Sequence, residues 1–191
     1  MRLISDVSES DVVRAFLSAD LGSPRTSGQL VANELRKKRL HESDLARTSI
    51  SEKEVLELRS IFQTCHGGTV RDLPFADTTW HRAQLVDGDC LHLMDYREFR
   101  DWTGGTLRPQ DAAAGFREHR GLDDLVAKID AGRAVPALIC VARSEASPPV
   151  VLDGSARAVA LEALSILHER EILLGISQRM NEWYFFPNRL M

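Results

Sequence analysis

The residues with the clearest chemical potential lie in one short segment near the end of the chain. Residues 150–152 are apolar and suit a buried strand, and residues 156–168 carry apolar side chains at roughly helical spacing. The turn between them, Asp153, Gly154 and Ser155, is therefore expected at a helix N-terminus. Backbone N–H groups there lack a partner within the helix, and the helix dipole favours an anion. The segment predicts a site for a phosphate or a carboxylate.

Three side chains at this turn, those of Asp153, Ser155 and Arg157, could bind an anion or take part in chemistry on it. Arg157 carries a fork of donors suited to phosphate, and Asp153 is expected to act as a base or to contact Mg²⁺. The residues expected to hold the anion are Gly154, Ser155, Ala156 and Arg157, and the candidate catalytic residues are Asp153, Ser155 and His81. The alternative is structural, because serine is a favoured helix N-cap and glycine a favoured turn residue. Ser155 would then only cap the helix.

A second loop is a candidate for the opposite wall of the same pocket. It contains two glycines between threonines and ends in an arginine, so backbone, hydroxyl and guanidinium donors can converge on an anion. The residues expected to contribute are Gly104, Gly105, Thr106 and Arg108. The alternative is a plain turn that leads into a helix at residues 111–117.

The histidines and cysteines give weaker indications. His81, next to Trp80, can act as an acid or base near neutral pH, and a structural histidine is the alternative. The three cysteines are widely spaced and form no Cys-x-x-Cys motif, which indicates neither a disulfide framework nor a zinc site. They are Cys65, Cys90 and Cys140, and the last is expected in the core because its segment is apolar. No metal-ligand motif is predicted.

The elements that must position the turn alternate between short strands and helices. The apolar residues at 134–141, which include Pro136, predict a strand, and shorter strands are expected at 79–85 and 91–94. Together with helices before and after them, they predict an α+β core over residues 69–191, with a small mixed sheet and flanking helices. The aromatic run at residues 183–186 is expected to complete this core, and a contact in a homodimer is the alternative.

The first part of the chain has a different character. Capping residues at 8–11 precede an apolar helical stripe, and further helices are expected at 27–40 and from about residue 51 to Gly67 and Gly68. Residues 1–68 are therefore predicted to form an N-terminal helical lobe. Apolar stripes of this kind are more often core than partner-binding surface.

The order of strand, polar turn, strand and Gly-Ser-Ala-Arg turn over residues 134–157 resembles the core of the ParB/sulfiredoxin superfamily. In that superfamily a strand pair feeds a Gly-x-x-Arg or Gly-His-x-Arg turn that holds nucleotide phosphates. Residues 78–82, 95–108 and 171–186 are similar to uncharacterised bacterial members whose turn reads Glu-Gly-His-x-Arg. The resemblance implies a ParB-like fold and a nucleoside phosphate, with Mg²⁺, as the ligand.

The turn also departs from the family pattern. Ser155 stands where relatives have a histidine and sulfiredoxins a reactive cysteine. Sulfiredoxin chemistry needs a thiolate, which a serine without an adjacent base does not replace, so that activity is not expected. A partition role is not expected either, because the stretch after Arg157 is too short for a helix-turn-helix domain.

Composition narrows the class of partner. The chain has 191 residues, 43% of them hydrophobic, and a formal net charge of −4, enough for a proper core but without a basic face for nucleic acid. The basic run at residues 36–39 is interpreted as a solvated helix face, since acidic residues bracket it. The sequence shows neither a targeting segment nor a membrane span, so a cytoplasmic location is expected.

Three functions follow from these observations. The first is binding of a nucleotide or another phosphorylated small molecule, with phosphoryl transfer or hydrolysis as the chemistry it would allow. The second is a non-catalytic binding or regulatory protein that has lost the turn histidine. The third and weakest is a DNA-associated protein or nuclease, which some relatives in the superfamily are.

Overall fold

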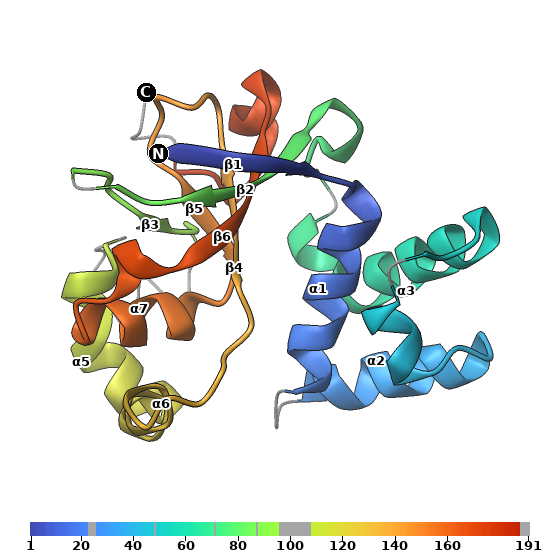
Figure 1. Cartoon of the computed structure of the whole chain (residues 1–191), viewed down its shortest axis with the longest axis horizontal. Helices are drawn as coiled ribbons and strands as arrows, with labels where there is room; N and C mark the ends of the chain where they lie inside the picture. The colour runs from blue at the N-terminus through green and yellow to red at the C-terminus, as the bar shows by residue number, and fades with distance from the viewer. Residues whose placement is uncertain (23–25, 48, 71, 87, 96–107, 188–191) are drawn as a thin grey trace. The chain divides into compact units, whose positions relative to one another are not determined.

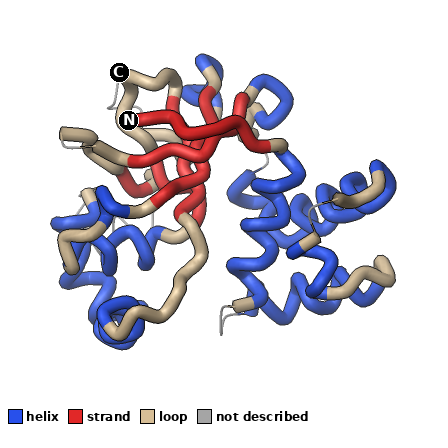
Figure 2. The backbone as a smooth tube through the Cα atoms, in the orientation of Figure 1, coloured by secondary structure: helices blue, strands red, loops and turns tan. Residues whose placement is uncertain are grey.

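The computed structural model describes residues 1–22, 26–47, 49–70, 72–86, 88–95 and 108–187. The chain divides into two compact units (Figure 1). One consists of Val7–Leu73, and the other joins Met1–Asp6 to Pro74–Met191. Helices make up the first unit and a sheet lies at the centre of the second (Figure 2).

Short-range capping determines where the helices of the first unit begin. Ser8 precedes α1 and forms a capping box with Asp11, in which the serine hydroxyl accepts from the Asp11 N–H at 3.1 Å. Ser51 and Glu54 repeat this arrangement at the start of α3. The elements are α1 (Glu9–Leu21), α2 (Thr26–Lys37), the 3₁₀ helix η1 (Glu42–Ala46) and α3 (Glu52–Val70).

Apolar stripes hold these helices together. The rings of Phe16 on α1 and Phe62 on α3 meet edge-on with centroids 4.9 Å apart, and the His66 ring lies 4.6 Å from that of Phe16. Apolar residues that are buried in this unit include Val12, Val13, Leu17, Val31, Leu35, Leu58 and Ile61. The stripes that the sequence shows are thus the core of a helical unit.

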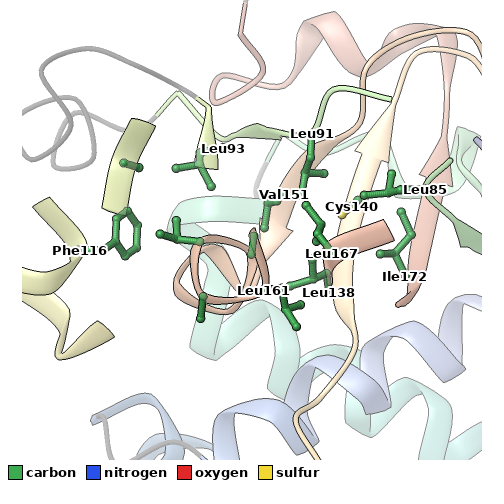
Figure 3. Close-up of a cluster of buried hydrophobic side chains, with 14 of the residues drawn as sticks. Leu85, Leu91, Leu93, Phe116, Leu138, Cys140, Val151, Leu161, Leu167 and Ile172 are labelled. Atoms are coloured by element: carbon green, nitrogen blue, oxygen red, sulfur yellow. The ribbon is translucent and has the colours of Figure 1, made fainter. Parts of the chain in front are cut away.

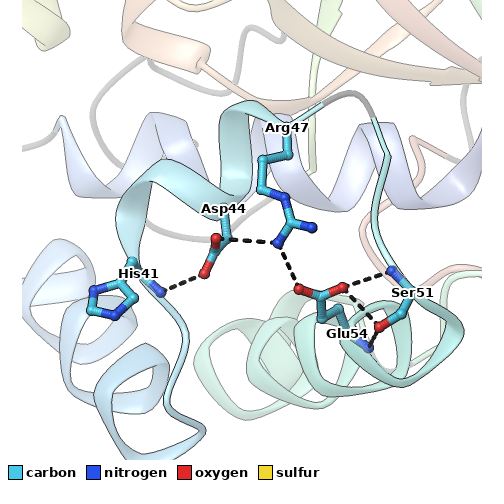
Figure 4. A network of polar contacts seen from close by, with 5 residues as sticks. All are labelled: His41, Asp44, Arg47, Ser51 and Glu54. Atoms are coloured by element: carbon cyan, nitrogen blue, oxygen red, sulfur yellow. Dashed lines mark hydrogen bonds and ion pairs between the residues drawn. The ribbon is translucent and has the colours of Figure 1, made fainter.

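A polar network ties η1 to the start of α3 (Figure 4). The Arg47 guanidinium donates to the Glu54 carboxylate at 2.7 Å and to Asp44 at 3.4 Å. Glu54 also accepts from the N–H and the hydroxyl of Ser51, each at 2.7 Å. The backbone N–H of Ser51, followed by the Ser51 hydroxyl and Arg47, lowers the pKa of Glu54 to about 2.

The second unit is built on a six-stranded mixed sheet. The pairs β2–β6 and β4–β5 are antiparallel, whereas β4–β6 and β3–β5 are parallel. In spatial order the strands are β1 (Arg2–Val7), β2 (Thr79–Gln84), β6 (Glu171–Ile176), β4 (Leu138–Ala142), β5 (Val150–Asp153) and β3 (His92–Leu93). The expected α+β class with a small mixed sheet is confirmed.

Helices and short 3₁₀ segments complete this unit. They are α5 (Pro109–Arg120), α6 (Leu122–Asp130), α7 (Ser155–Ala163), η2 (Phe75–Asp77), η3 (Leu167–Glu169) and η4 (Gln178–Glu182). The core between the sheet and the helices contains Leu138 and Cys140 from β4, Leu161 from α7 and Phe116 from α5 (Figure 3). Every residue of β4 is buried, which suits a strand at the centre of a sheet.

Three details differ from the expectations. Residues 2–7, expected within the helical lobe, form an edge strand of the sheet, where Leu3 packs against the core. The helix expected to end at Gly67 and Gly68 continues through both to Val70, because each glycine fits helical backbone and tertiary packing overrides its low propensity. In the aromatic run at 183–186, Trp183 and Phe186 are buried as expected, but Tyr184 is 78% exposed.

Candidate functional site

The candidate site is the corner at residues 153–157, where β5 ends and α7 begins. Gly154 joins them with φ at +96°, a conformation that L side chains rarely adopt. A Cβ at this position would lie 2.7 Å from Arg157 Nη2 and 2.8 Å from Leu138 Cδ2. Glycine is therefore required twice, for the backbone angle and for the close approach of these two side chains.

Arg157 folds back over Gly154 and forms an ion pair with Asp153. Its Nη2 donates to Asp153 Oδ2 at 2.6 Å and to the Ala137 carbonyl at 3.4 Å. The two side chains are four residues apart, and only 15% and 24% of their surfaces, respectively, are exposed. Arg157 Nε is buried without a hydrogen-bond partner among the described residues. One donor of the guanidinium thus lacks an acceptor among the described residues.

The N-terminus of α7 is open at this corner. Gly154 occupies the N-cap position, so no side-chain cap is formed there among the described residues. The first N–H groups of α7, on Ser155, Ala156 and Arg157, are those that lack a partner within any α-helix. Ser155 is the first residue of the helix and is buried. The alternative in which Ser155 caps the helix is therefore wrong, because glycine holds that position.

Cys140 lies in the core close enough to the corner for its charges to act on the thiol. Burial raises the pKa of Cys140 well above the ordinary value for cysteine, the Asp153 carboxylate raises it further, and Arg157 opposes both effects. The thiol stays protonated at neutral pH. Cys140 is a core residue, as expected, and has none of the thiolate character that a nucleophile needs.

His81 lies away from the corner. It sits on β2, opposite Leu174 of β6, and its Nδ1 makes a 2.8 Å hydrogen bond with Asp6. Between β2 and β5 lie β6 and β4, so at about 4.8 Å per strand His81 is separated from Asp153 by about 14 Å. The structure does not bring these two candidate catalytic residues together.

The second loop is only partly within the described residues. Gly104, Gly105 and Thr106 lie outside them, so the expected second wall remains a prediction. Arg108 is exposed just before α5. Burial lowers the pKa of His92, and the positive charge of Arg108 lowers it further. His92 is beside Val150, at the opposite end of β5 from Asp153.

Sequence reasoning missed three residues at this edge of the sheet. Ala137 supplies a carbonyl to Arg157, and Leu138 packs on Gly154. Asp95 follows the end of β3, which runs parallel to β5, so its carboxyl group belongs to the same edge as Asp153. Knowledge that β3 pairs in parallel with β5 would have placed Asp95 at the same sheet edge as Asp153. The local sequence does not show which strands pair.

The described residues include no group of three or more His, Cys, Asp or Glu side chains placed to hold a metal ion. Within the same residues, none of the helices is sufficiently long and apolar to traverse a bilayer. Comparison of the chain with protein-family models, with curated proteins and with solved structures found no match.

Proposed function

We propose that this protein binds a phosphorylated small molecule, a nucleoside phosphate first among them, at the corner of residues 153–157. The carrying observation is an uncapped helix N-terminus whose N-cap glycine lies under the guanidinium of Arg157. Backbone N–H groups and an arginine fork are the donors that phosphate prefers. The resemblance to nucleotide-binding turns points to the same ligand class.

Binding requires Arg157 to exchange partners. The Asp153 carboxylate lies 2.6 Å from the guanidinium and neutralises it. A phosphate brings its own negative charge, so it competes with Asp153 for the same donors. The buried Arg157 Nε, which has no acceptor among the described residues, is the donor that a ligand would satisfy. Asp153, once released, would be free to contact a Mg²⁺ ion on the phosphate.

The arrangement favours a binding role over catalysis. Ser155 is buried at the first turn of α7, and His81, the candidate base, lies on β2 next to Asp6. A hydroxyl nucleophile needs a base within hydrogen-bond reach. Asp153 is the one carboxylate of the corner itself, and in the proposal it contacts the cation on the phosphate. A non-catalytic binding or regulatory protein is therefore the preferred form of the proposal, with phosphoryl transfer as the alternative.

Thermal shift with inorganic phosphate, ADP and ATP, each with and without Mg²⁺, tests this proposal. A ligand at one hundred times its Kd should stabilise the protein by about 2.7 kcal/mol. For a chain of this size that corresponds to a rise in Tm of about 5–10 °C. Arg157→Ala should abolish the shift, and the matched control Arg179→Ala, which removes an exposed arginine of the same unit, should retain it.

Two results would contradict the proposal. One is a shift that persists in a folded Arg157→Ala protein, which would place the ligand elsewhere. The other is the absence of a shift with every phosphate compound. Turnover of a ligand that binds would favour the phosphoryl-transfer alternative over the binding role.

A further inference from the structure

A cavity opens in the helical unit between the N-terminal ends of α1 and α3. Its volume is about 250 Å³. A cavity of about 150 Å³ holds benzene in a protein core, and pockets for drug-sized ligands begin at about 300 Å³. The cavity therefore has room for a small metabolite. The residues that line it are Ser8, Glu9, Ser10 and Val13 at the start of α1, and Val55, Leu56, Leu58 and Arg59 on α3.

The position of the cavity follows from the way the two helices meet. Glu9 on α1 pairs with Arg59 on α3, and further along both helices the ring of Phe16 meets that of Phe62, so the helices run in the same direction. Glu9 is the first residue of α1, whereas Arg59 lies about two turns into α3. The first turns of α3 therefore extend beyond the start of α1. The two serines at that end of α1 have side chains too short to fill the space.

The cavity combines an apolar inner part with a charged rim. Val13 and Leu58 are almost completely buried, so they form the inner part. The side chains of Glu9 and Arg59 are 31% and 42% exposed, and the Arg59 guanidinium lies 3.0 and 3.2 Å from the two carboxylate oxygens of Glu9. An ion pair this exposed contributes little to stability, so both groups can take new partners at little cost.

Charge complementarity selects the ligand of this cavity. A carboxylate that binds Arg59 comes close to the negative charge of Glu9, and an amine that binds Glu9 comes close to the positive charge of Arg59. A ligand with both charges side by side satisfies both groups at once. In an α-amino acid the carboxylate, the ammonium and the side chain are all attached to one carbon. With an apolar side chain, such a molecule matches the rim and the inner part together.

We propose that this cavity binds a free α-amino acid with an apolar side chain, such as leucine. The carboxylate of the ligand accepts from Arg59, its ammonium donates to Glu9, and its side chain packs on Val13 and Leu58. It also covers Leu56, which is 65% exposed. All of these residues belong to the helical unit, so this site is separate from the corner of residues 153–157.

Saturation-transfer NMR of the full chain with L-leucine tests the proposal. The methyl protons of leucine should receive more saturation than its α proton, because the side chain enters the cavity. Arg59→Gln and Glu9→Gln each remove one charge of the rim and should weaken binding, measured by titration calorimetry, by at least about tenfold. Lys37→Gln, which removes one exposed partner of an ion pair on α2, is the matched control and should bind leucine like wild type.

Ligand analogues and a filled cavity test the same site independently of the rim variants. Isocaproate and isopentylamine each keep the branched side chain of leucine but only one of its charges, and both should bind at least about tenfold more weakly than leucine. Glycine has both charges and no side chain and should also bind more weakly. Ser10→Leu fills the cavity without removing either rim charge and should abolish binding. Circular dichroism of each variant establishes that it is folded.

Three results would overturn the proposal. One is the absence of saturation transfer to leucine at millimolar concentration. Another is binding of isocaproate or isopentylamine as tight as that of leucine, which would assign a ligand with a single charge to the cavity. The third is wild-type affinity for leucine in the folded Arg59→Gln or Ser10→Leu protein, which would place the amino acid elsewhere.

Discussion

At the scale of single residues, Gly154 and Arg157 define the corner more sharply than any other pair. Gly154 has a left-handed backbone, and the guanidinium of Arg157 lies in the space that a Cβ would fill. The sequence correctly indicated a glycine turn before a helix. It did not indicate the ion pair between Arg157 and Asp153. Asp153 precedes the helix, so whether the two side chains meet depends on the backbone angles of the turn between β5 and α7.

Gly154→Ala should destabilise the protein by about 1–3 kcal/mol, because alanine is strained at this φ and its Cβ meets Arg157 and Leu138. Gly67→Ala is the matched control. A Cβ at Gly67, within α3, has no heavy atom within 4 Å apart from its own helix, so this change should be neutral or stabilise by up to about 1 kcal/mol. Urea unfolding measures both. Equal effects of the two substitutions would contradict the account of the corner.

Asp153→Asn should strengthen binding of inorganic phosphate and weaken any dependence on Mg²⁺. The substitution removes the charge that competes with phosphate for Arg157 and also removes the carboxylate expected to contact the cation. Calorimetric titration with phosphate, with and without Mg²⁺, measures both effects. A weaker affinity without Mg²⁺ would mean that the Asp153–Arg157 ion pair organises the site instead of competing with the ligand.

At the scale of elements, the sequence was most informative where the relevant contacts are local. The Ser-x-x-Asp pattern before α1 is a capping box in the structure, and the strand, the turn and the start of the helix around Gly154 lie where the apolar spacing placed them. The helix ends at Ala163, five residues before the expected end at residue 168. Strand pairing is not local. Nothing in residues 2–7 shows that they add to β2, and nothing around His81 shows that two strands separate it from β5.

The start of α3 should show a pH dependence of stability. Hydrogen bonds from Ser51 and Arg47 lower the pKa of Glu54 from its ordinary value of 4.5 to about 2. A lowered carboxyl pKa stabilises the fold above the unfolded value, and that contribution is lost as pH falls from about 4.5 to about 2. Glu54→Gln can still accept the capping hydrogen bond but does not titrate.

Urea unfolding between pH 7 and pH 2 measures this contribution as the difference between wild type and Glu54→Gln. The difference should be greatest at pH 7 and should vanish near pH 2. Glu52→Gln, in the same first turn of α3, is the matched control for the loss of one acidic residue. A difference that stays constant with pH would show that the ionised Glu54 carboxylate does not stabilise the helix.

At the scale of the whole molecule, the prediction of a helical part followed by an α+β part agrees with the fold. The boundary differs at the start of the chain, because residues 1–6 belong to the α+β unit and not to the helical one. Strand β1 belongs to the sheet unit although it comes before the first helix. In long segments, the spacing of apolar residues distinguished helices from strands. It could not assign a six-residue segment with one packed side chain, because such a segment gains its stability from the strand beside it.

The buried Trp183 side chain should contribute strongly to stability. Trp183 is almost completely buried, and its ring meets that of Phe185 with centroids 5.8 Å apart. Trp183→Ala should cost about 3–5 kcal/mol because it removes a large core side chain and leaves a cavity. Tyr184→Ala, at an exposed neighbouring position, should change stability by less than about 0.5 kcal/mol. Thermal and urea unfolding of both variants check this, and comparable losses would contradict it.

The burial of Cys140 allows opening of the sheet unit to be followed by thiol labelling. A thiol-labelling reagent reaches this sulfur only when the sheet and the helices above it separate, whereas Cys65 and Cys90 are partly accessible in the closed fold. The rate of the slow labelling phase therefore measures how often the sheet unit opens. A ligand that binds the corner of residues 153–157 stabilises the closed form, so its binding should slow the labelling of Cys140.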